Sequence, residues 1–193
     1  MSKINKITPL TNVKFLNLYE LEAENKFGNT HPYYVASRKD KNTMMAATKK
    51  VIPDGVVIYS LFGEKADKLI MVKQFRYPNR IETLEIPAGK LEANENPKDC
   101  AFRELEEETN NRAREMKFIM KVLPSPGYTS EWLYLYEAID FEEVDDALEG
   151  DEDEFIDIIK LDIDEAYQKV LSGEIVDAKT VIAIMYAYQQ VHH

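Results

Sequence analysis

Hydrophobic and charged residues alternate near the start of the chain. Tyr19, Leu21 and Ala23 alternate with three glutamates, and a period of two is typical of a β-strand with one buried face. A Gly-Asn dipeptide at 28–29 precedes a second apolar run at 33–36, so the two runs are predicted to pair as an antiparallel hairpin. This hairpin comes before the main body of the chain, and its edges are suited to packing across a partner subunit.

The rest of the pattern predicts strands around one helix, with two further helices at the end of the chain. Apolar runs that predict strands lie at 56–62, 68–75, 81–86, 117–123 and 132–139. The later helices are predicted at 164–171, where Gly173 ends the first, and from Asp177 onward. We therefore expect an α/β/α sandwich with a mixed sheet, in which residues 1–45 form an N-terminal hairpin region and residues 46–193 the main domain.

A helix is predicted from residue 97 because its start carries two local markers. Asn96 suits the N-cap, and Pro97 suits the first helical position. Ala101, Phe102 and Leu105 then form an apolar stripe, which indicates the face that packs on the core.

Three glutamates share the opposite face of this helix. Glu104, Glu107 and Glu108 stand at i, i+3 and i+4, which places their Cβ atoms about 5–6 Å apart. Like charges at that distance repel, and acids in the last turn oppose the negative end of the helix. A hard cation such as Mg²⁺ would offset this cost, because it prefers oxygen ligands and commonly shares its shell with phosphates.

The spacing of this segment resembles the Nudix hydrolase box, Gly-x5-Glu-x7-Arg-Glu-U-x-Glu-Glu-x-Gly-U, where U is a bulky aliphatic residue. The residues on its fixed positions are Gly89, Glu95, Arg103, Glu104, Leu105, Glu107 and Glu108. Asn110 replaces the last glycine, a mild departure because Asn tolerates the left-handed conformation that ends a helix. Asn111 replaces the last aliphatic residue, which affects only the packing after the helix.

Segments outside the box resemble the ADP-ribose pyrophosphatase branch of this family. They are Gln74–Arg76, Glu85–Lys90, Ser125–Gly127 with Glu131, and the acidic stretch Asp151–Glu154. A proline about sixteen residues beyond the last glycine position of the box, here Pro126, is the usual hallmark of that branch.

The resemblance implies a role for each matching residue. The Ala88 carbonyl, Glu104, Glu108 and Glu154 would hold Mg²⁺, with Glu107 bound directly or through water, and Mn²⁺ is an alternative ion. Glu152 resembles the general base, although a glutamate of the box could serve instead, and Arg103 would orient a carboxylate. Gly89, predicted in the loop before the helix, would allow close backbone approach to an ion or phosphate, and Glu95 completes the motif. Arg76 would contact the diphosphate, Glu131 the terminal ribose, and Phe15 and Arg38 the adenine.

Several of these residues have simpler explanations that the sequence leaves open. An acidic run such as 151–154 is more often a solvated loop, although it lacks the pattern of an EF-hand calcium loop. Arg76 could be an edge-strand charge, Phe15 a core residue, and Pro126 only a stiffener of its turn.

Composition narrows the class of protein further. The chain has 193 residues, 45% of them hydrophobic, and a net charge of −11, so no basic surface is expected to bind nucleic acid. No apolar run approaches the length of a membrane span, and the polar N-terminus lacks a signal peptide's apolar core. The single cysteine, Cys100, precludes an internal disulfide and is expected to be a buried thiol. Together these features favour a cytoplasmic protein.

The resemblance implies metal-dependent hydrolysis of the diphosphate bond of ADP-ribose, or a related ADP-sugar, to AMP and ribose 5-phosphate. A Nudix hydrolase of another nucleotide sugar, such as GDP-mannose, is the enzymatic alternative. A non-catalytic sensor of a nucleotide sugar is the alternative from another class. A homodimer is expected, since the branch resemblance implies N-terminal strands exchanged between subunits.

Overall fold

The computed structural model describes residues 1–150 and 156–192, and the chain divides into two compact units. The first comprises Met1–Asp54 and Leu123–Leu133, and the second comprises Gly55–Val122 and Tyr134–His193. The predicted domain division after residue 45 stays a prediction. The first unit continues to Asp54 and takes in a loop from much later in the sequence.

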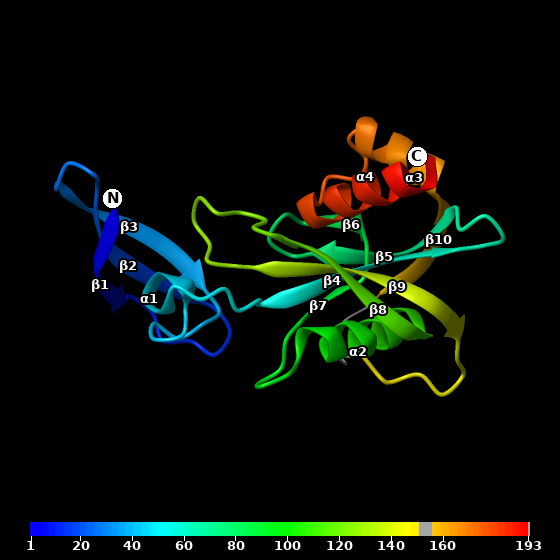
Figure 1. Ribbon diagram of the computed structural model, residues 1–193, viewed down its shortest axis with the longest axis horizontal. Helices are drawn as coiled ribbons and strands as arrows, with labels where there is room; N and C mark the ends of the chain where they lie inside the picture. The colour runs from blue at the N-terminus through cyan, green and yellow to red at the C-terminus, as the bar shows by residue number, and fades with distance from the viewer. Residues whose placement is uncertain (151–155, 193) are drawn as a thin grey trace. The chain divides into compact units, whose positions relative to one another are not determined.

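The first unit contains a three-stranded antiparallel sheet in the order β1-β2-β3 (Figure 1). Its strands are β1 (Lys3–Pro9), β2 (Asn17–Glu24) and β3 (Thr30–Ser37), followed by the short helix α1 (Met45–Thr48). The predicted hairpin of β2 and β3 is confirmed, and β1 is an additional strand. Tyr19 and Leu21 are buried, with Val35 and Met44, in a small core.

A loop at 123–133 packs against β3 within this first unit. The Ala36 amide donates to the Tyr128 carbonyl over 2.8 Å, and the Ser130 amide donates to the Ala36 carbonyl over 3.2 Å. The Tyr33 hydroxyl donates to the Gly127 carbonyl over 2.5 Å. These bonds fix the segment that carries Pro126 and Glu131.

The second unit is built on a larger sheet, seven-stranded within the described residues, in the order β10-β5-β4-β9-β8, with β6 paired to β5 and β7 to β4. Its strands are β4 (Gly55–Phe62), β5 (Lys68–Arg76), β6 (Ile81–Glu85), β7 (Ala88–Lys90), β8 (Asn111–Val122), β9 (Leu133–Glu143) and β10 (Asp157–Asp162). Helix α2 (Pro97–Thr109) covers one face, while α3 (Ile163–Leu171) and α4 (Ala178–His192) cover the other (Figure 1). The predicted α/β/α sandwich is confirmed.

Residue Gly89 lies in a short strand, where the sequence predicted a loop, so that prediction is wrong. In β7, Gly89 pairs with Val56 and Ala88 with Val57 of β4. This pairing fixes the backbone of the segment before α2 to a central strand of the sheet.

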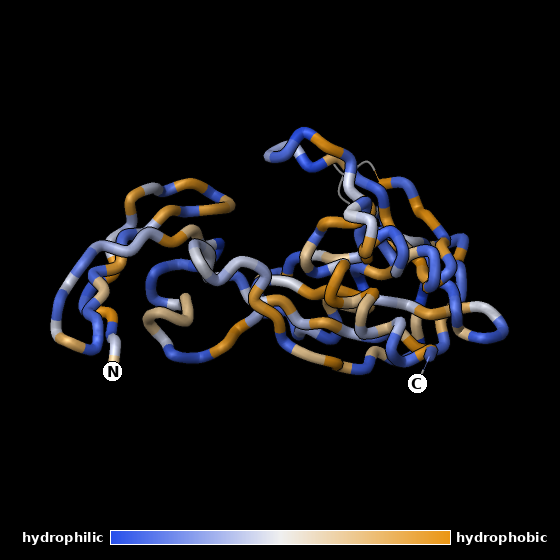
Figure 2. Tube along the Cα trace, turned by 90° about the horizontal axis from the view of Figure 1, so that it is seen from above, coloured by the Kyte–Doolittle hydropathy of each residue, from blue (hydrophilic) through white to orange (hydrophobic). Residues whose placement is uncertain are grey.

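The core under α2 joins that helix to the sheet. Cys100, Ala101 and Leu105 of α2 pack with Val56 and Ile58 of β4, and hydrophobic stretches run along the tube of this unit between hydrophilic turns (Figure 2). Cys100 is fully buried, as predicted, and burial raises the pKa of its thiol. Among the helices in the described part of the chain, none combines the length and apolar character needed to span a membrane.

The N-cap of α2 offers a direct stability test. The Asn96 side chain accepts a hydrogen bond from the Lys98 amide over 2.8 Å, as the sequence predicted. We expect Asn96→Ala to lower the free energy of unfolding by about 1 kcal/mol, because an amide of the first turn loses its partner. Urea denaturation measures this change. Asn96→Asp should keep most of the stability, and an equal loss in both variants would contradict a capping role.

Candidate active site

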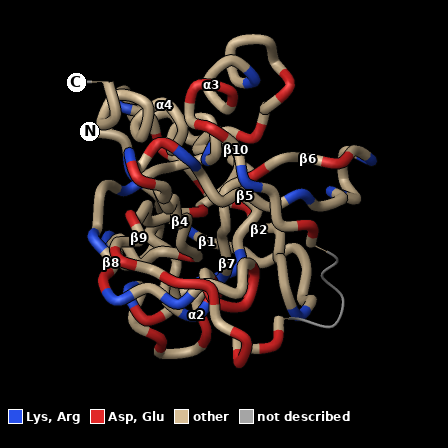
Figure 3. The backbone as a smooth tube through the Cα atoms, turned by 90° about the vertical axis from the view of Figure 1, so that its right-hand side faces the viewer, with Lys and Arg blue, Asp and Glu red and all other residues tan. Residues whose placement is uncertain are grey.

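Helix α2 carries several acidic residues, and red segments lie near it in Figure 3 together with blue segments that mark Lys and Arg. Glu104 and Glu108 are more than nine-tenths buried, although carboxylates are rarely buried without a compensating group. Glu106, at a variable position of the box, is also buried. The acids of this helix are therefore not simply surface charges in contact with water. The burial of these acids indicates a specific arrangement.

Glu104 and Glu108 lie against the backbone of β7. A Cβ added to Gly89 would overlap the Glu104 carboxylate, so only glycine leaves room for that group in its present position. The Ala88 amide donates to Oε2 of Glu108 over 2.9 Å. The close approach predicted at Gly89 is therefore an approach to the carboxylate of Glu104.

Arg103 joins three of the box glutamates. Its Nε and Nη2 donate to the two carboxylate oxygens of Glu95 over 2.9 and 3.0 Å, which is a bidentate pair. Its Nη1 donates to Glu104 over 2.9 Å and to Glu107 over 2.7 Å. The Arg103 hydrogen bonds hold the pKa of Glu95 below its usual value. Arg103 thus contacts Glu95, Glu104 and Glu107 at once, and its role in orienting a carboxylate stays a prediction.

The donor set suits a hard divalent cation. Glu104 and Glu108 offer carboxylate oxygens beside the β7 backbone, where the missing Cβ of Gly89 leaves space. Within the described residues, no three His, Cys, Asp or Glu side chains already form a cluster that could hold a metal ion. Glu107 is instead paired with Arg103. The metal-binding roles of these residues stay predictions.

Arg76, at the end of β5, is held by the buried carboxylate of Glu85, a contact that the sequence did not predict. Its Nε and Nη2 donate to the two oxygens of Glu85 over 2.7 and 2.6 Å. Glu85 also accepts from the Thr83 hydroxyl over 2.6 Å and from Lys179 of α4. Burial alone would raise the pKa of Glu85, but hydrogen bonds from Arg76 and the charge of Lys179 hold it at about 2.

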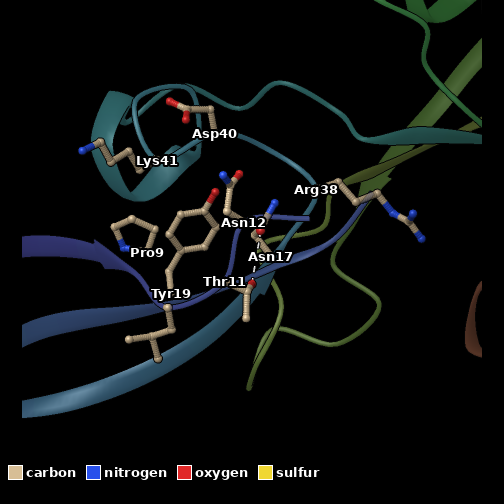
Figure 4. Close-up of a pocket in the computed structure, with 9 residues that line it drawn as sticks. Pro9, Thr11, Asn12, Asn17, Tyr19, Arg38, Asp40 and Lys41 are labelled. Atoms are coloured by element: carbon tan, nitrogen blue, oxygen red, sulfur yellow. Dashed lines mark hydrogen bonds between the residues drawn. The ribbon is translucent and has the colours of Figure 1, made fainter. Parts of the chain in front are cut away.

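In the first unit, Arg38 and Glu131 come together. Arg38 Nε lies 3.8 Å from Oε1 of Glu131. Arg38 also lines a hollow of about 580 Å³ beside β2, and its side chain points away from Tyr19 and Asp40 (Figure 4). Phe15 is 64% exposed, so the explanation of Phe15 as a core residue is wrong.

The acidic loop after β9 is only partly described. Glu152 and Glu154, the predicted base and metal ligand, lie outside the described residues. The segment just before them is tied to α2, because Glu106 accepts a hydrogen bond from the Leu148 amide over 3.2 Å. Glu106 also accepts from Arg112 of β8 over 2.9 and 2.7 Å.

Comparisons with known proteins find similar sequences and a similar structure. The model of the NUDIX domain matches residues 51–182. Over 138 residues the chain is 41% identical to a "Methanol dehydrogenase activator" of Bacillus methanolicus, covering 72% of this chain and 74% of the relative. It is 40% identical over 134 residues to an "ADP-ribose pyrophosphatase" of Bacillus subtilis (strain 168), covering 69% and 71%.

Two further matches extend over nearly the whole chain. A "GDP-mannose pyrophosphatase" of Yersinia pestis (strain Pestoides F) is 29% identical over 191 residues and covers 93% of both proteins. A crystal structure of an ADP compounds hydrolase superposes with a TM-score of 0.79 at 19% identity, covering 99% of this chain and 94% of that one. At that identity the structural match supports the fold alone.

Proposed function

This chain belongs to the Nudix family, and we propose that it hydrolyses the diphosphate bond of ADP-ribose, or of a related ADP-sugar, to give AMP and ribose 5-phosphate. The observation that carries the proposal is the pair of buried carboxylates, Glu104 and Glu108, held against the glycine backbone of β7. A relative at 40% identity is named for the same reaction.

Nudix hydrolases generally depend on a divalent metal ion, and we propose Mg²⁺ for this chain, with Mn²⁺ as the alternative. The Ala88 carbonyl, Glu104 and Glu108 would hold it, with Glu107 and Glu154 as further ligands. The bound ion would supply positive charge to the diphosphate oxygens and stabilise the charge that develops on them. Arg103 would keep Glu104 and Glu107 oriented through the hydrogen bonds described above.

Arg76 would contact the diphosphate directly. Glu85 engages Nε and Nη2 of Arg76. The Arg76 side chain is nevertheless 40% exposed, so its guanidinium can meet an anionic ligand. Arg76 would therefore neutralise part of the charge that makes a diphosphate resistant to attack by water.

A carboxylate would accept the proton of the attacking water. We propose Glu152 for this role on the family resemblance, with Glu107 as the alternative because its carboxylate belongs to the same group of acids held by Arg103. In the first unit, we propose that Glu131 contacts the terminal ribose, that Pro126 shapes its loop, and that Phe15 and Arg38 contact adenine. The exposure of Phe15 is compatible with stacking on a base.

A second substrate class has one specific observation in its favour. The GDP-mannose pyrophosphatase match covers 93% of this chain, more than the 69% covered by the ADP-ribose pyrophosphatase. We favour ADP-ribose because identity to that relative is higher, at 40% against 29%.

A substrate panel separates these two functions. We would compare kcat/KM for ADP-ribose, ADP-glucose, GDP-mannose and UDP-glucose, each with Mg²⁺ and with EDTA. The proposal predicts that the two ADP-sugars are preferred and that chelation abolishes turnover. Preference for GDP-mannose would instead indicate a GDP-mannose hydrolase. Binding of a nucleotide sugar without turnover of any compound would favour a sensor.

We also propose a homodimer formed through the first unit. Ile4, Leu18 and Tyr34 of its small sheet are each at least 40% exposed, and exposed strand edges commonly need cover. Sedimentation at micromolar concentration should give twice the mass of one chain, and a monomer there would contradict the proposal. A cytoplasmic location also stays a prediction.

Replacing Gly89 with alanine should lower activity while changing stability little. The added methyl group would displace the Glu104 carboxylate, which can move because it is the end of a flexible side chain. We expect kcat to fall by about 100-fold, as for other misplaced catalytic groups, with a small change in the unfolding midpoint. Gly127→Ala is the matched control, because no atom lies within 4 Å of its added Cβ. Unchanged kcat in Gly89→Ala would contradict the role assigned to Glu104.

A further inference from the structure

The carboxylate of Glu85 is saturated with hydrogen-bond donors. Oε1 accepts from Arg76 and Thr83, and Oε2 accepts from Arg76 and Lys179. A carboxylate has about four lone-pair positions, so these four donors leave it little freedom to rotate. The guanidinium plane of Arg76 is consequently fixed by groups on two other elements, Thr83 on β6 and Lys179 on α4.

The first turn of α4 is itself anchored beside this carboxylate. Oδ2 of Asp177 accepts from Lys179 over 2.8 Å, from the Thr180 amide over 3.1 Å and from the Thr180 hydroxyl over 2.7 Å. The Thr180 hydroxyl accepts from the Ile86 amide over 3.1 Å. Ile86 is two residues before Ala88, so the same turn of α4 contacts the strand end that leads into the box.

Arg76 and Lys179, the two cations that share Glu85, differ in how far their side chains are exposed to solvent. The Arg76 side chain is 40% exposed, whereas that of Lys179 is only 12% exposed and Glu85 is 1% exposed. Lys179 has described partners in Glu85 and Asp177. Arg76 is thus the cation that can meet a ligand, and Lys179 is placed to hold the carboxylate behind it.

We propose that Lys179 is a positioning residue for hydrolysis, which acts through Glu85 to hold Arg76 in the orientation that binds the diphosphate of the substrate. This inference rests on the proposed function and extends it to α4, about seventy residues beyond the box along the sequence. The arrangement has a physical reason. A bidentate Arg–carboxylate pair fixes the guanidinium only as firmly as the carboxylate itself is fixed.

The purely structural alternative is that Lys179 only docks α4 on the sheet. Loss of such a contact would lower the unfolding midpoint and leave the kinetics of the folded enzyme unchanged. A positioning role instead changes kcat and KM at temperatures where every variant is folded. The two roles are therefore distinguished by kinetics measured well below the unfolding midpoint.

Lys179→Met tests the proposal with ADP-ribose and Mg²⁺ at 25 °C. We expect kcat/KM to fall by about 10- to 100-fold, because a displaced contact group loses much of its effect. Lys179→Arg should restore most of the activity, and Lys179→Gln keeps a donor without the charge if the Met variant does not fold. Lys169→Met is the matched control, since it removes another lysine–glutamate pair, 2.7 Å from Glu174 after α3, and should leave kcat/KM unchanged.

A double-mutant cycle identifies the route of the effect. In an Arg76→Ala background, Lys179→Met should change kcat/KM little, because its target is already absent. An equal loss in both backgrounds, or unchanged kinetics of folded Lys179→Met and Lys179→Gln, would overturn the proposal.

Binding of ADP-ribose in EDTA, measured by calorimetry, separates this proposal from the proposed function. If the wild-type chain binds ADP-ribose in EDTA but does not cleave it when Mg²⁺ is supplied, the proposed hydrolysis fails. Weaker binding by both Arg76→Ala and Lys179→Met would still support the positioning role. A wild-type chain that neither cleaves nor binds ADP-ribose would overturn both proposals.

Discussion

Glu104→Gln and Glu108→Gln are each expected to lower kcat for ADP-ribose by about 10²–10³-fold, the range for losing a major electrostatic contribution to a transition state. Glutamine nearly preserves the shape of the side chain but removes the negative charge that a divalent cation requires. The β7 backbone and Arg103, which contact these two carboxylates, would remain in place. Steady-state kinetics with saturating Mg²⁺ measure the effect.

Two further measurements make this test specific. Glu165→Gln on α3 removes a helical glutamate that pairs with Lys169 at 3.7 Å, and it should retain wild-type kcat. Calorimetric titration with Mn²⁺ should show weaker binding to the Glu104 and Glu108 variants. Wild-type kcat in either variant would contradict the assignment of the metal site.

The largest stability effect is expected at Glu85. Glu85→Gln should lower the free energy of unfolding by about 3 kcal/mol at pH 7, the value that corresponds to a pKa of about 2 in place of 4.5. The variant leaves Arg76 and Lys179 without their shared carboxylate, and breaking a buried ion pair from one side is costly.

The dependence of this effect on pH follows from the lowered pKa. The stability from Glu85 is fully present above about pH 4.5 and is lost as the pH falls toward about 2, where the folded protein also binds the proton. The difference in unfolding free energy between wild type and Glu85→Gln should therefore shrink below pH 4.5. Urea denaturation between pH 7 and pH 3 measures it.

Glu82→Gln is the matched control for this prediction. Glu82 lies on the same strand and pairs with Lys73, but its side chain is 59% exposed, so its removal should change stability little. An equal loss of stability in the two variants, or a difference for Glu85→Gln that does not depend on pH, would contradict the account of the buried cluster.

The box helix was predictable because its determinants are local. The Asn96 side chain caps the first turn as predicted. Asn110 ends the helix in the left-handed conformation, with a φ of 55°, as expected for a residue that tolerates it. Cys100 and Leu105 are buried on the predicted apolar face.

Some strands could not be predicted because their stability is not encoded in local alternation. Strand β1 is mostly exposed, with Ile4 40% exposed, and it is held by pairing with β2, for example Ile7 with Leu21. Strand β7 has only three residues, too few for a period to be detected. Both strands are instead held by backbone pairing with another strand, β1 with β2 and β7 with β4.

The buried ion pairs around Glu85 also could not be predicted from the sequence. Glu85 and Lys179 are 94 residues apart, and a lysine near the start of a helix carries no local sign of a distant partner. The sequence identified Arg76 and the segment that contains Glu85 by resemblance, but not their contact. Such ion pairs depend on the packing of α4 against the sheet.

The proposed hydrolysis of ADP-ribose can be tested by identifying its products. The purified chain would be incubated with ADP-ribose and Mg²⁺ in ¹⁸O-labelled water. The products would then be separated and their masses measured by mass spectrometry. We expect AMP and ribose 5-phosphate in equal amounts, one of them carrying a single ¹⁸O, and no products in EDTA. ADP with free ribose, or intact ADP-ribose in the presence of Mg²⁺, would contradict this expectation.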